Sequence, residues 1–171
     1  MSKYYLYQDT KKCIGCQACE VQCKANKDLL EGPKPCGIVQ VGPKFINGLP
    51  KISYVFMPCF HCEIPWCVTD CPTGAMQKRV SDGIVFVDKE LCVGCKVCVT
   101  ACPWAAPQWN PEEGKVVKCD YCKDRVDDGQ KPACVTTCTT GCLSFGSVEE
   151  MTRVIRERRA KAVTSLEKSS F

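Results

Sequence analysis

The chain has 171 residues, a formal net charge of +4 and 18 cysteines. This length fits one domain or two small ones. No apolar run is long enough to cross a membrane, so we expect no transmembrane segment. No basic run with interleaved aromatic residues is present, so nucleic-acid binding is not expected either.

The cysteine content exceeds one residue in ten, which is typical of secreted disulfide scaffolds. However, the N-terminal sequence MSKYYLYQDTKK has neither the apolar core nor the cleavage site of a signal peptide. We therefore expect a cytoplasmic protein, in which thiols stay reduced and clustered cysteines bind metal. Disulfide bonding is the minor alternative, and a partner with its own export signal could carry the chain across a membrane.

The first elements in chain order are a strand and a cysteine-rich loop. The aromatic run that begins at Tyr5 predicts a short strand. The first cysteine quartet follows, with the spacing C-x2-C-x2-C-x3-C, at Cys13, Cys16, Cys19 and Cys23. Residues Lys27–Pro50 are rich in Gly and Pro and predict a loop or cover segment. The next stretch, Lys51–Met57, is a candidate strand.

Three further quartets follow, and each ends in C-x3-C. The second, spaced C-x2-C-x4-C-x3-C, is Cys59, Cys62, Cys67 and Cys71. The third repeats the spacing of the first at Cys92, Cys95, Cys98 and Cys102. The fourth, spaced C-x2-C-x11-C-x3-C, is Cys119, Cys122, Cys134 and Cys138. Cys36 and Cys142 remain, and we interpret both as small buried side chains.

The spacing C-x2-C-x2-C-x3-C, followed by Pro103 in the third quartet, is the signature of bacterial ferredoxins. Three closely spaced cysteines bind one 4Fe–4S cluster. The fourth, about one helical turn further on, points away and ligates another cluster, so such motifs occur in pairs. A structural zinc protein is the alternative from another class, because zinc modules also use C-x2-C pairs. A zinc site does not, however, require the third cysteine two residues further on.

The first and third quartets lie in an internal repeat with an offset of 79 residues, from Cys13 to Cys92. Both copies begin with a strand signal and have Gly before the second cysteine, at Gly15 and Gly94. Glycine there lets backbone amides approach the cluster sulfurs. After quartets two and four, a turn with Gly precedes a short apolar strand. The repeated unit is therefore strand, cluster loop, short helix and strand.

The segment from Ser147 to Val163 predicts an amphipathic helix, which begins with a capping box of Ser147 and Glu150. We expect it to pack on its own protein, with a partner- or membrane-facing role as the alternative. The only histidine, His61, is expected beside the cluster ligands or in solvent, because no quartet lacks a cysteine. No acid–base pair is evident, so we expect no catalytic residue.

In the order and spacing of these quartets, the chain resembles the four-cluster ferredoxin-like electron-transfer subunits of the dimethyl sulfoxide reductase, formate dehydrogenase and hydrogenase type. The resemblance extends from about Lys3 to Gly146. The segments CFHCEIPWCVTDCPTGAM and CPWAAPQWNPEEGKVVKCDYC are most similar to the small polyferredoxin subunit of tungsten-dependent aldehyde oxidoreductase complexes. The chain departs from the motif at Thr139, where the motif has Pro, and at Cys142, where it has Ala.

The resemblance implies an α+β fold with two ferredoxin-like units, each holding two clusters, and a C-terminal helix. The inner unit, 51–111, is inserted in the outer unit, 1–50 and 112–146, with the helix and tail at 147–171. It also implies four ligand sets: Cys13, Cys16, Cys19 and Cys138 for cluster A; Cys119, Cys122, Cys134 and Cys23 for cluster B; Cys59, Cys62, Cys67 and Cys102 for cluster C; Cys92, Cys95, Cys98 and Cys71 for cluster D.

The function implied is that of a non-catalytic subunit that carries single electrons by means of four 4Fe–4S clusters. The expected partners are a catalytic subunit with a tungsten or molybdenum pterin, of the aldehyde oxidoreductase type, and a second redox partner. The latter would be a flavin- or NAD-binding subunit or further copies of this chain. The alternatives are a diffusible polyferredoxin and the iron–sulfur subunit of a formate dehydrogenase or hydrogenase complex.

Overall fold

The computed structural model describes residues 4–29 and 31–167, so residues 168–171 of the predicted tail lie outside the described residues. In this part of the chain, short strands form two-stranded sheets. The strands are β1 (Tyr5–Gln8), β2 (Gly37–Ile46), β3 (Leu49–Met57), β4 (Met76–Lys78), β5 (Val85–Val87), β6 (Gln108–Asn110), β7 (Lys115–Val117) and β8 (Leu143–Gly146). The helices are α1 (Ala18–Ala25), α2 (Trp66–Thr69), α3 (Val97–Ala101), α4 (Lys123–Asp127), α5 (Ala133–Thr136) and α6 (Val148–Glu167).

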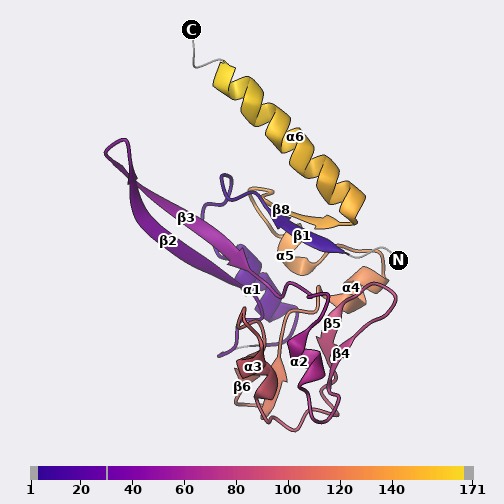
Figure 1. The fold of residues 1–171 in the computed structure, drawn as a ribbon. Coiled ribbons are helices and arrows are strands. Elements are labelled where there is room, and N and C mark those ends of the chain that lie inside the picture. The colour runs from indigo at the N-terminus through magenta and orange to yellow at the C-terminus, as the bar shows by residue number, and fades with distance from the viewer. Residues whose placement is uncertain (1–3, 30, 168–171) are drawn as a thin grey trace.

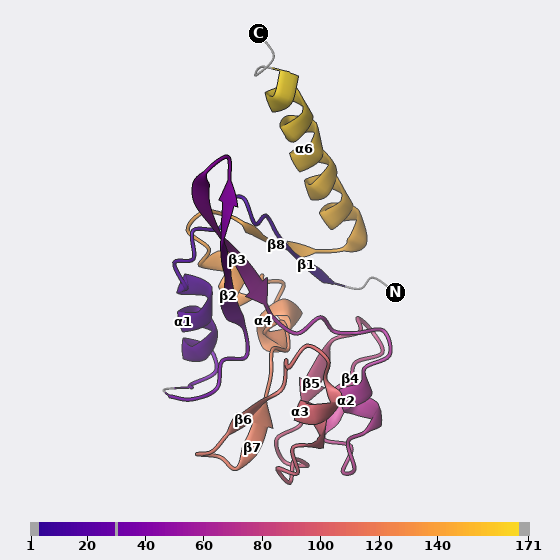
Figure 2. The same cartoon turned by 60° about the vertical axis from the view of Figure 1, so that its left-hand side comes forward.

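All strand pairs in the described residues are antiparallel. One pair joins strands from the two ends of the chain, and the others join strands that are consecutive in the sequence. β1 pairs with β8 from the far end of the chain, and α1 packs against α5. β2 pairs with β3, β4 with β5 and β6 with β7, while α2 packs against α3. Figures 1 and 2 show β1, β8 and α1 in one half of the molecule and α2, α3, β4 and β5 in the other. The predicted α+β class with a C-terminal helix is confirmed.

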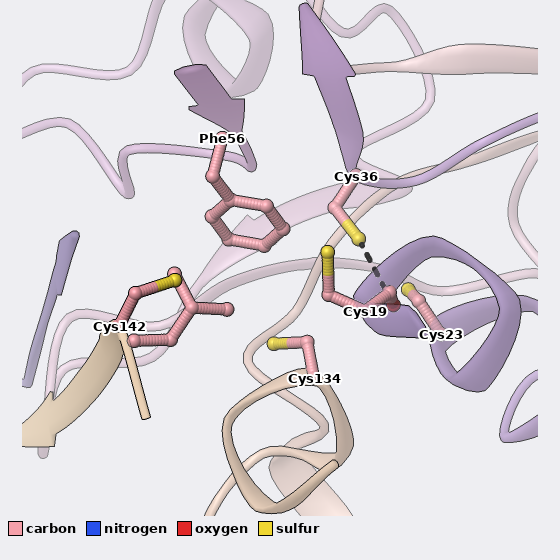
Figure 3. Close-up of a cluster of buried hydrophobic side chains, with 7 residues drawn as sticks. Cys19, Cys23, Cys36, Phe56, Cys134 and Cys142 are labelled. Carbon is pink, nitrogen blue, oxygen red and sulfur yellow. Dashed lines mark hydrogen bonds between the residues drawn. The ribbon is translucent and has the colours of Figure 1, made fainter. Parts of the chain in front are cut away.

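Cysteines form much of the interior. One cluster of buried side chains joins α1, the start of β2, α5 and the start of β8 (Figure 3). Its members are Cys19, Cys23, Cys36, Phe56, Cys134, Cys142 and Leu143. Two further clusters in the middle of the chain also contain predicted cluster ligands beside Ile84, Val85 and Val116. Because large apolar side chains are few in this core, thiols occupy the positions that Leu or Ile fill in other small domains.

The segment Lys27–Pro50 is not a loop throughout, as the sequence predicted. β2 covers Gly37–Ile46 and pairs along its length with β3. The Gly and Pro that suggested a loop, Gly42 and Pro43, lie where the register shifts between Val41 and Lys44. A bulge in a two-stranded ribbon accommodates both residues, because the unpaired position needs no ladder hydrogen bond from Pro. The hairpin extends away from the rest of the molecule (Figure 1).

Helix α6 begins as predicted. The Ser147 amide donates to Glu150 Oε2 at 2.7 Å, and the Glu150 amide lies 3.3 Å from Ser147 Oγ, as in a capping box. Its first turns pack on β8 and β1 through the buried Met151. Arg158 Nε lies 3.0 Å from Asp9 Oδ2 and ties the helix to the end of β1. The helix continues to Glu167, past the predicted end, and Figure 1 shows its second half extending outward. None of the helices in the described residues is long and apolar enough to cross a membrane.

Candidate cofactor sites

Thiols from both ends of the chain line a hollow beside α1. Its cysteines are Cys13, Cys16, Cys19, Cys138 and Cys142, and Ile14, Ile38 and Leu143 add apolar walls. The fold thus brings three cysteines of the first quartet together with one from the fourth. Cys142, for which the sequence predicted only a packing role, is a fifth thiol in the same wall.

A second hollow lies beside α3 in the other half of the molecule. Its cysteines are Cys71, Cys92, Cys95 and Cys98, and its apolar walls include Met76, Val87 and Val116. Here three cysteines of the third quartet meet one from the second. The two halves of the internal repeat therefore build equivalent thiol-lined spaces.

The remaining quartet members also gather in two groups. Burial, and after it the charges of Cys119, Cys122 and Cys23, raise the pKa of the Cys134 thiol. Burial raises the pKa of Cys67 to about 11, although the charge of Lys118 acts to lower it. The charges of three other cysteines, Cys59, Cys102 and Cys62, raise the pKa of Cys67 further. Each of these thiols thus lies near the other cysteines of one predicted ligand set. Burial and mutual repulsion favour the neutral thiols, so these cysteines become thiolates together only when a cationic centre stabilises them.

The loops that carry the triple cysteines depend on left-handed backbone. Gly15 and Gly94 both have φ of 70°, and Gln17 and Lys96, which cap α1 and α3, have φ of 59° and 64°. Packing gives a further reason for glycine. A Cβ at Gly94 would overlap the Gly114 carbonyl oxygen, and one at Gly15 would lie 2.5 Å from the Tyr54 ring. Glycine is therefore required here by close approach as well as by φ.

Two lysines bring positive charge toward the thiols. Lys118 is 3% exposed, and its Nζ donates to the carbonyl oxygens of Val85 and Cys119, the latter at 2.6 Å. Lys27 Nζ lies 2.7 Å from Asp120 Oδ1. Burial alone would lower the pKa of Lys27, but Asp120 and the charges of Cys119 and Cys122 raise it overall. Sequence reasoning missed the burial of Lys118, for which the only signal is its place directly before Cys119.

His61 is buried and does not face solvent. Its Nδ1 accepts a hydrogen bond from the Val85 amide at 2.8 Å, and its ring lies 3.7 Å from that of Tyr121. Burial, and then the charge of Lys118, lower the pKa of His61. The neutral imidazole therefore supports β5 next to Cys62, as expected for a residue beside the ligands.

These sites fit 4Fe–4S clusters better than single metal ions. Among residues 4–29 and 31–167, no three His, Cys, Asp or Glu side chains converge closely enough to hold one ion. Thiols from two quartets instead line each of the two apolar hollows. A cluster of iron and sulfide needs such a space with thiolate donors around it. Soft thiolate donors also select this chemistry over that of hard oxygen-binding cations.

Family models match most of the chain. Residues 50–148 match the 4Fe-4S dicluster domain, and residues 10–26 match a 4Fe-4S binding domain. These matches define an iron–sulfur protein of the dicluster class.

Comparison with named relatives identifies the family of the chain within this class. It is 43% identical over 151 residues to the thiosulfate reductase electron transfer subunit PhsB of Salmonella typhi, covering 87% of this chain and 78% of the relative. It is 40% identical over 157 residues to the B subunit of the anaerobic dimethyl sulfoxide reductase of Escherichia coli, covering 88% and 76%. The nitrate-inducible formate dehydrogenase iron-sulfur subunit of that species is 35% identical over 168 residues, covering 90% and 57%. The chain belongs to this family of iron–sulfur electron-transfer subunits.

Two properties follow from family membership. The cofactors are 4Fe–4S clusters, and the four cysteine quartets provide for four of them. The chain is a non-catalytic electron-transfer subunit of an oxidoreductase complex, as the relatives' names indicate for them.

Proposed function

We propose that this chain carries single electrons between a catalytic subunit with a tungsten or molybdenum pterin and a second redox partner, in the cytoplasm. When bound, a 4Fe–4S cluster accepts and releases one electron. The observation that carries the proposal is the presence of thiol-lined hollows in both halves of one small protein. The relatives support the general role, because they are named as subunits of thiosulfate reductase, dimethyl sulfoxide reductase and formate dehydrogenase.

We further propose that the ligands cross between quartets in two nested units. Cluster A would take Cys13, Cys16, Cys19 and Cys138, and cluster D would take Cys71, Cys92, Cys95 and Cys98, as the two hollows are lined. The charge contacts of Cys134 and Cys67 support the sets given above for clusters B and C. The pairing of β1 with β8 supports an outer unit made from both chain ends. The boundary proposed at residues 111 and 112 falls in the turn between β6 and β7.

Electrostatic contacts between the thiols support a row of the four proposed groups in the order A, B, C, D. The charge of Cys19 in group A raises the pKa of Cys134 in group B, so these two groups are neighbours. In the same way, the charge of Cys59 in group C raises the pKa of Cys119 in group B. The charge of Cys67 in group C raises the pKa of Cys98 in group D. Cys16 in group A and Cys95 in group D are exposed, whereas the four cysteines of group B are buried. A row with an exposed thiol at each end supports a carrier that contacts two different partners.

The finer assignment to an aldehyde oxidoreductase complex rests on the two sequence segments quoted above. The formate dehydrogenase relative supports the alternative that the catalytic partner acts on formate. The second partner would be a flavin- or NAD-binding subunit or another copy of this chain. Anaerobic purification of the native complex, followed by identification of the co-purified subunits and their metals, separates these possibilities. A lone 18.9 kDa species would instead indicate a diffusible polyferredoxin.

Metal analysis tests the central proposal. We expect about sixteen irons and sixteen acid-labile sulfides per chain. A few zinc ions without sulfide would contradict it.

The ligand sets have their own test, the variant Cys138→Ala. We expect it to remove the paramagnetic signal of the cluster held by Cys13, Cys16 and Cys19. Loss of only the cluster held by Cys119, Cys122 and Cys134 would contradict the crossed arrangement.

A further inference from the structure

The two hollows are lined by matching positions, so each serves as a reference for the other. In the triple-cysteine loops, Cys13, Ile14, Cys16, Gln17 and Cys19 of the first hollow match Cys92, Val93, Cys95, Lys96 and Cys98 of the second. After the fourth ligand, Cys138, Thr140, Cys142 and Leu143 of the first hollow match Cys71, Thr73, Ala75 and Met76 of the second. Most pairs keep the same chemistry. Two do not: Gln17 faces the first hollow where Lys96 faces the second, and Cys142 stands where the second has Ala75.

The backbone around Cys142 and Ala75 is the same. The Asp9 amide donates to the Cys142 carbonyl oxygen at 2.8 Å, and the Asp88 amide donates to the Ala75 carbonyl oxygen at 2.7 Å. Each residue directly precedes a strand, β8 or β4. At this position, therefore, the two sites differ in the side chain.

The Cys142 thiol points at a predicted ligand. Its Sγ lies 3.4 Å from Cys138 Sγ, within hydrogen-bond distance for two sulfurs, and the residue is 4% exposed. Figure 3 shows Cys142 in the same buried cluster of side chains as Cys19 and Cys134. The side chain of the matching Ala75 offers no donor to Cys71 Sγ. The backbone donors are shared by the two sites, because Cys71 bonds to the Met76 amide at 3.4 Å and Cys138 bonds to the backbone of Leu143, the residue that matches Met76.

We propose that Cys142 is a positioning residue that donates an S–H hydrogen bond to the Cys138 sulfur and thereby raises the reduction potential of cluster A above the value that it would have with alanine at this position. This inference rests on the proposed function. A donor to a ligand sulfur stabilises the more negative charge of the reduced cluster, so the potential rises. A thiol is a weak donor, so the effect is modest and local. Cys142 adds no ligand, because Cys13, Cys16, Cys19 and Cys138 already supply four thiolates.

The test compares three variants of the full chain with its clusters in place. Cys142→Ala gives the first hollow the side chain of the second, Ala75→Cys makes the reciprocal change, and Cys142→Ser keeps a donor. Iron and sulfide content shows whether all clusters assemble. A potentiometric titration followed by electron paramagnetic resonance gives each cluster's midpoint potential.

We expect Cys142→Ala to keep full iron content and to lower the potential of one cluster, leaving the others in place. Ala75→Cys should raise the potential of a different cluster, and Cys142→Ser should stay at or above the wild-type value. If Cys142→Ala fails to assemble, the Ser variant decides: an assembled chain with a raised or unchanged potential supports the donor role, and a lowered one overturns it.

Two results overturn the inference and leave the proposed function intact. Unchanged potentials in Cys142→Ala with full iron content would make the thiol a filler of space. Loss of one cluster in Cys142→Ala and in Cys142→Ser would make Cys142 a ligand. Failure of the proposed function is distinct from both, because it would appear as missing iron and sulfide in the unsubstituted chain.

Discussion

Lys118 brings a positive charge into the interior, where lysine is rarely found unless it is paired. It has two carbonyl acceptors, and no carboxylate within salt-bridge distance is found for it among the described residues. A buried ammonium without a counter-charge costs several kcal/mol. We infer that the thiolate-bound clusters supply the counter-charge, because Lys118 lies close enough to influence both Cys67 and Cys119.

The variant Lys118→Met removes this charge and keeps an unbranched apolar stem. A cation near a cluster favours its reduced state, so we expect the potentials of clusters B and C to fall by on the order of 50 mV. Redox titration of the full chain measures the change. Lys89→Met is the control, because Lys89 is about half exposed and pairs with Glu113 at the surface. Equal potentials in Lys118→Met and wild type would contradict the inference.

The backbone at Gly94 has no room for a side chain, even one as small as a single Cβ atom. A Cβ there would overlap the Gly114 carbonyl oxygen, whereas a Cβ at Gly129 would meet nothing within 4 Å. Both residues have positive φ, at 70° and 73°. Gly129→Ala therefore carries only the left-handed backbone cost of about 1–2 kcal/mol.

We expect Gly94→Ala to be destabilised beyond Gly129→Ala and to lose the cluster beside α3, because the loop must move away from backbone that cannot yield. Denaturant unfolding under anaerobic conditions and iron content measure the two effects. Similar unfolding midpoints and full iron content in both variants would show that the loop has room.

At the scale of elements, the β2–β3 hairpin combines a structural and an exposed part. Its base lies over the first cluster loop, where Tyr54 packs on Gly15 and the Gln8 side chain bonds to Tyr54 and Phe56 backbone. Its tip carries Phe45 and Leu49, which are 73% and 71% exposed. Exposed apolar side chains gathered at one place mark interaction surfaces. The hairpin therefore links cluster A to a surface available for a partner.

We predict that Phe45→Ser combined with Leu49→Ser weakens binding to the catalytic subunit and leaves the clusters intact. Removing two exposed apolar anchors costs an interface about 2–4 kcal/mol, or more than tenfold in Kd. Affinity measured with the purified partner, alongside iron content, checks this. Val80→Ser is the matched control, since Val80 is 83% exposed in the other half of the molecule. An unchanged Kd in the double variant would show that the partner docks elsewhere.

At the scale of the whole molecule, the clusters are part of the core. Five of the seven side chains in the buried cluster between α1, α5 and the start of β8 are cysteines, and the sheets of the described residues have two strands each. Isolated two-stranded sheets are marginally stable at best. In the described part of the chain, helices α2, α3, α4 and α5 have five or fewer residues, too short to be stable alone. Bound clusters therefore supply contacts that this chain's apolar side chains do not.

We expect removal of iron by an anaerobic chelator to unfold most of the chain, because metal binding is coupled to folding. Circular dichroism and hydrogen exchange should show that the sheet formed by β1 and β8 and the short helices are lost together. Restoring iron and sulfide under reducing conditions should restore them. An apo-chain that kept its exchange protection would mean that the thiols and the apolar residues pack into a core without clusters.

The cofactor class, the family and the α+β architecture with a C-terminal helix could be predicted from the amino-acid sequence. Ligand spacing is a local property: three cysteines within seven residues must lie on one short loop, and a capping box such as Ser147 and Glu150 acts within one turn. The same locality predicted β1, β8 and the start of α6 correctly. The prediction was wrong for β2, because Gly42 and Pro43 are strand breakers unless a partner strand accommodates them in a bulge.

Which distant side chains meet was settled by the three-dimensional packing. It brought Cys138 and Cys142 to the hollow lined by Cys13, Cys16 and Cys19, buried Lys118, and left Trp66 and Trp104 exposed. These outcomes depend on contacts between residues far apart in the chain, such as the pairing of β1 with β8. No local spacing encodes such contacts, because they result from how whole elements pack around the hollows.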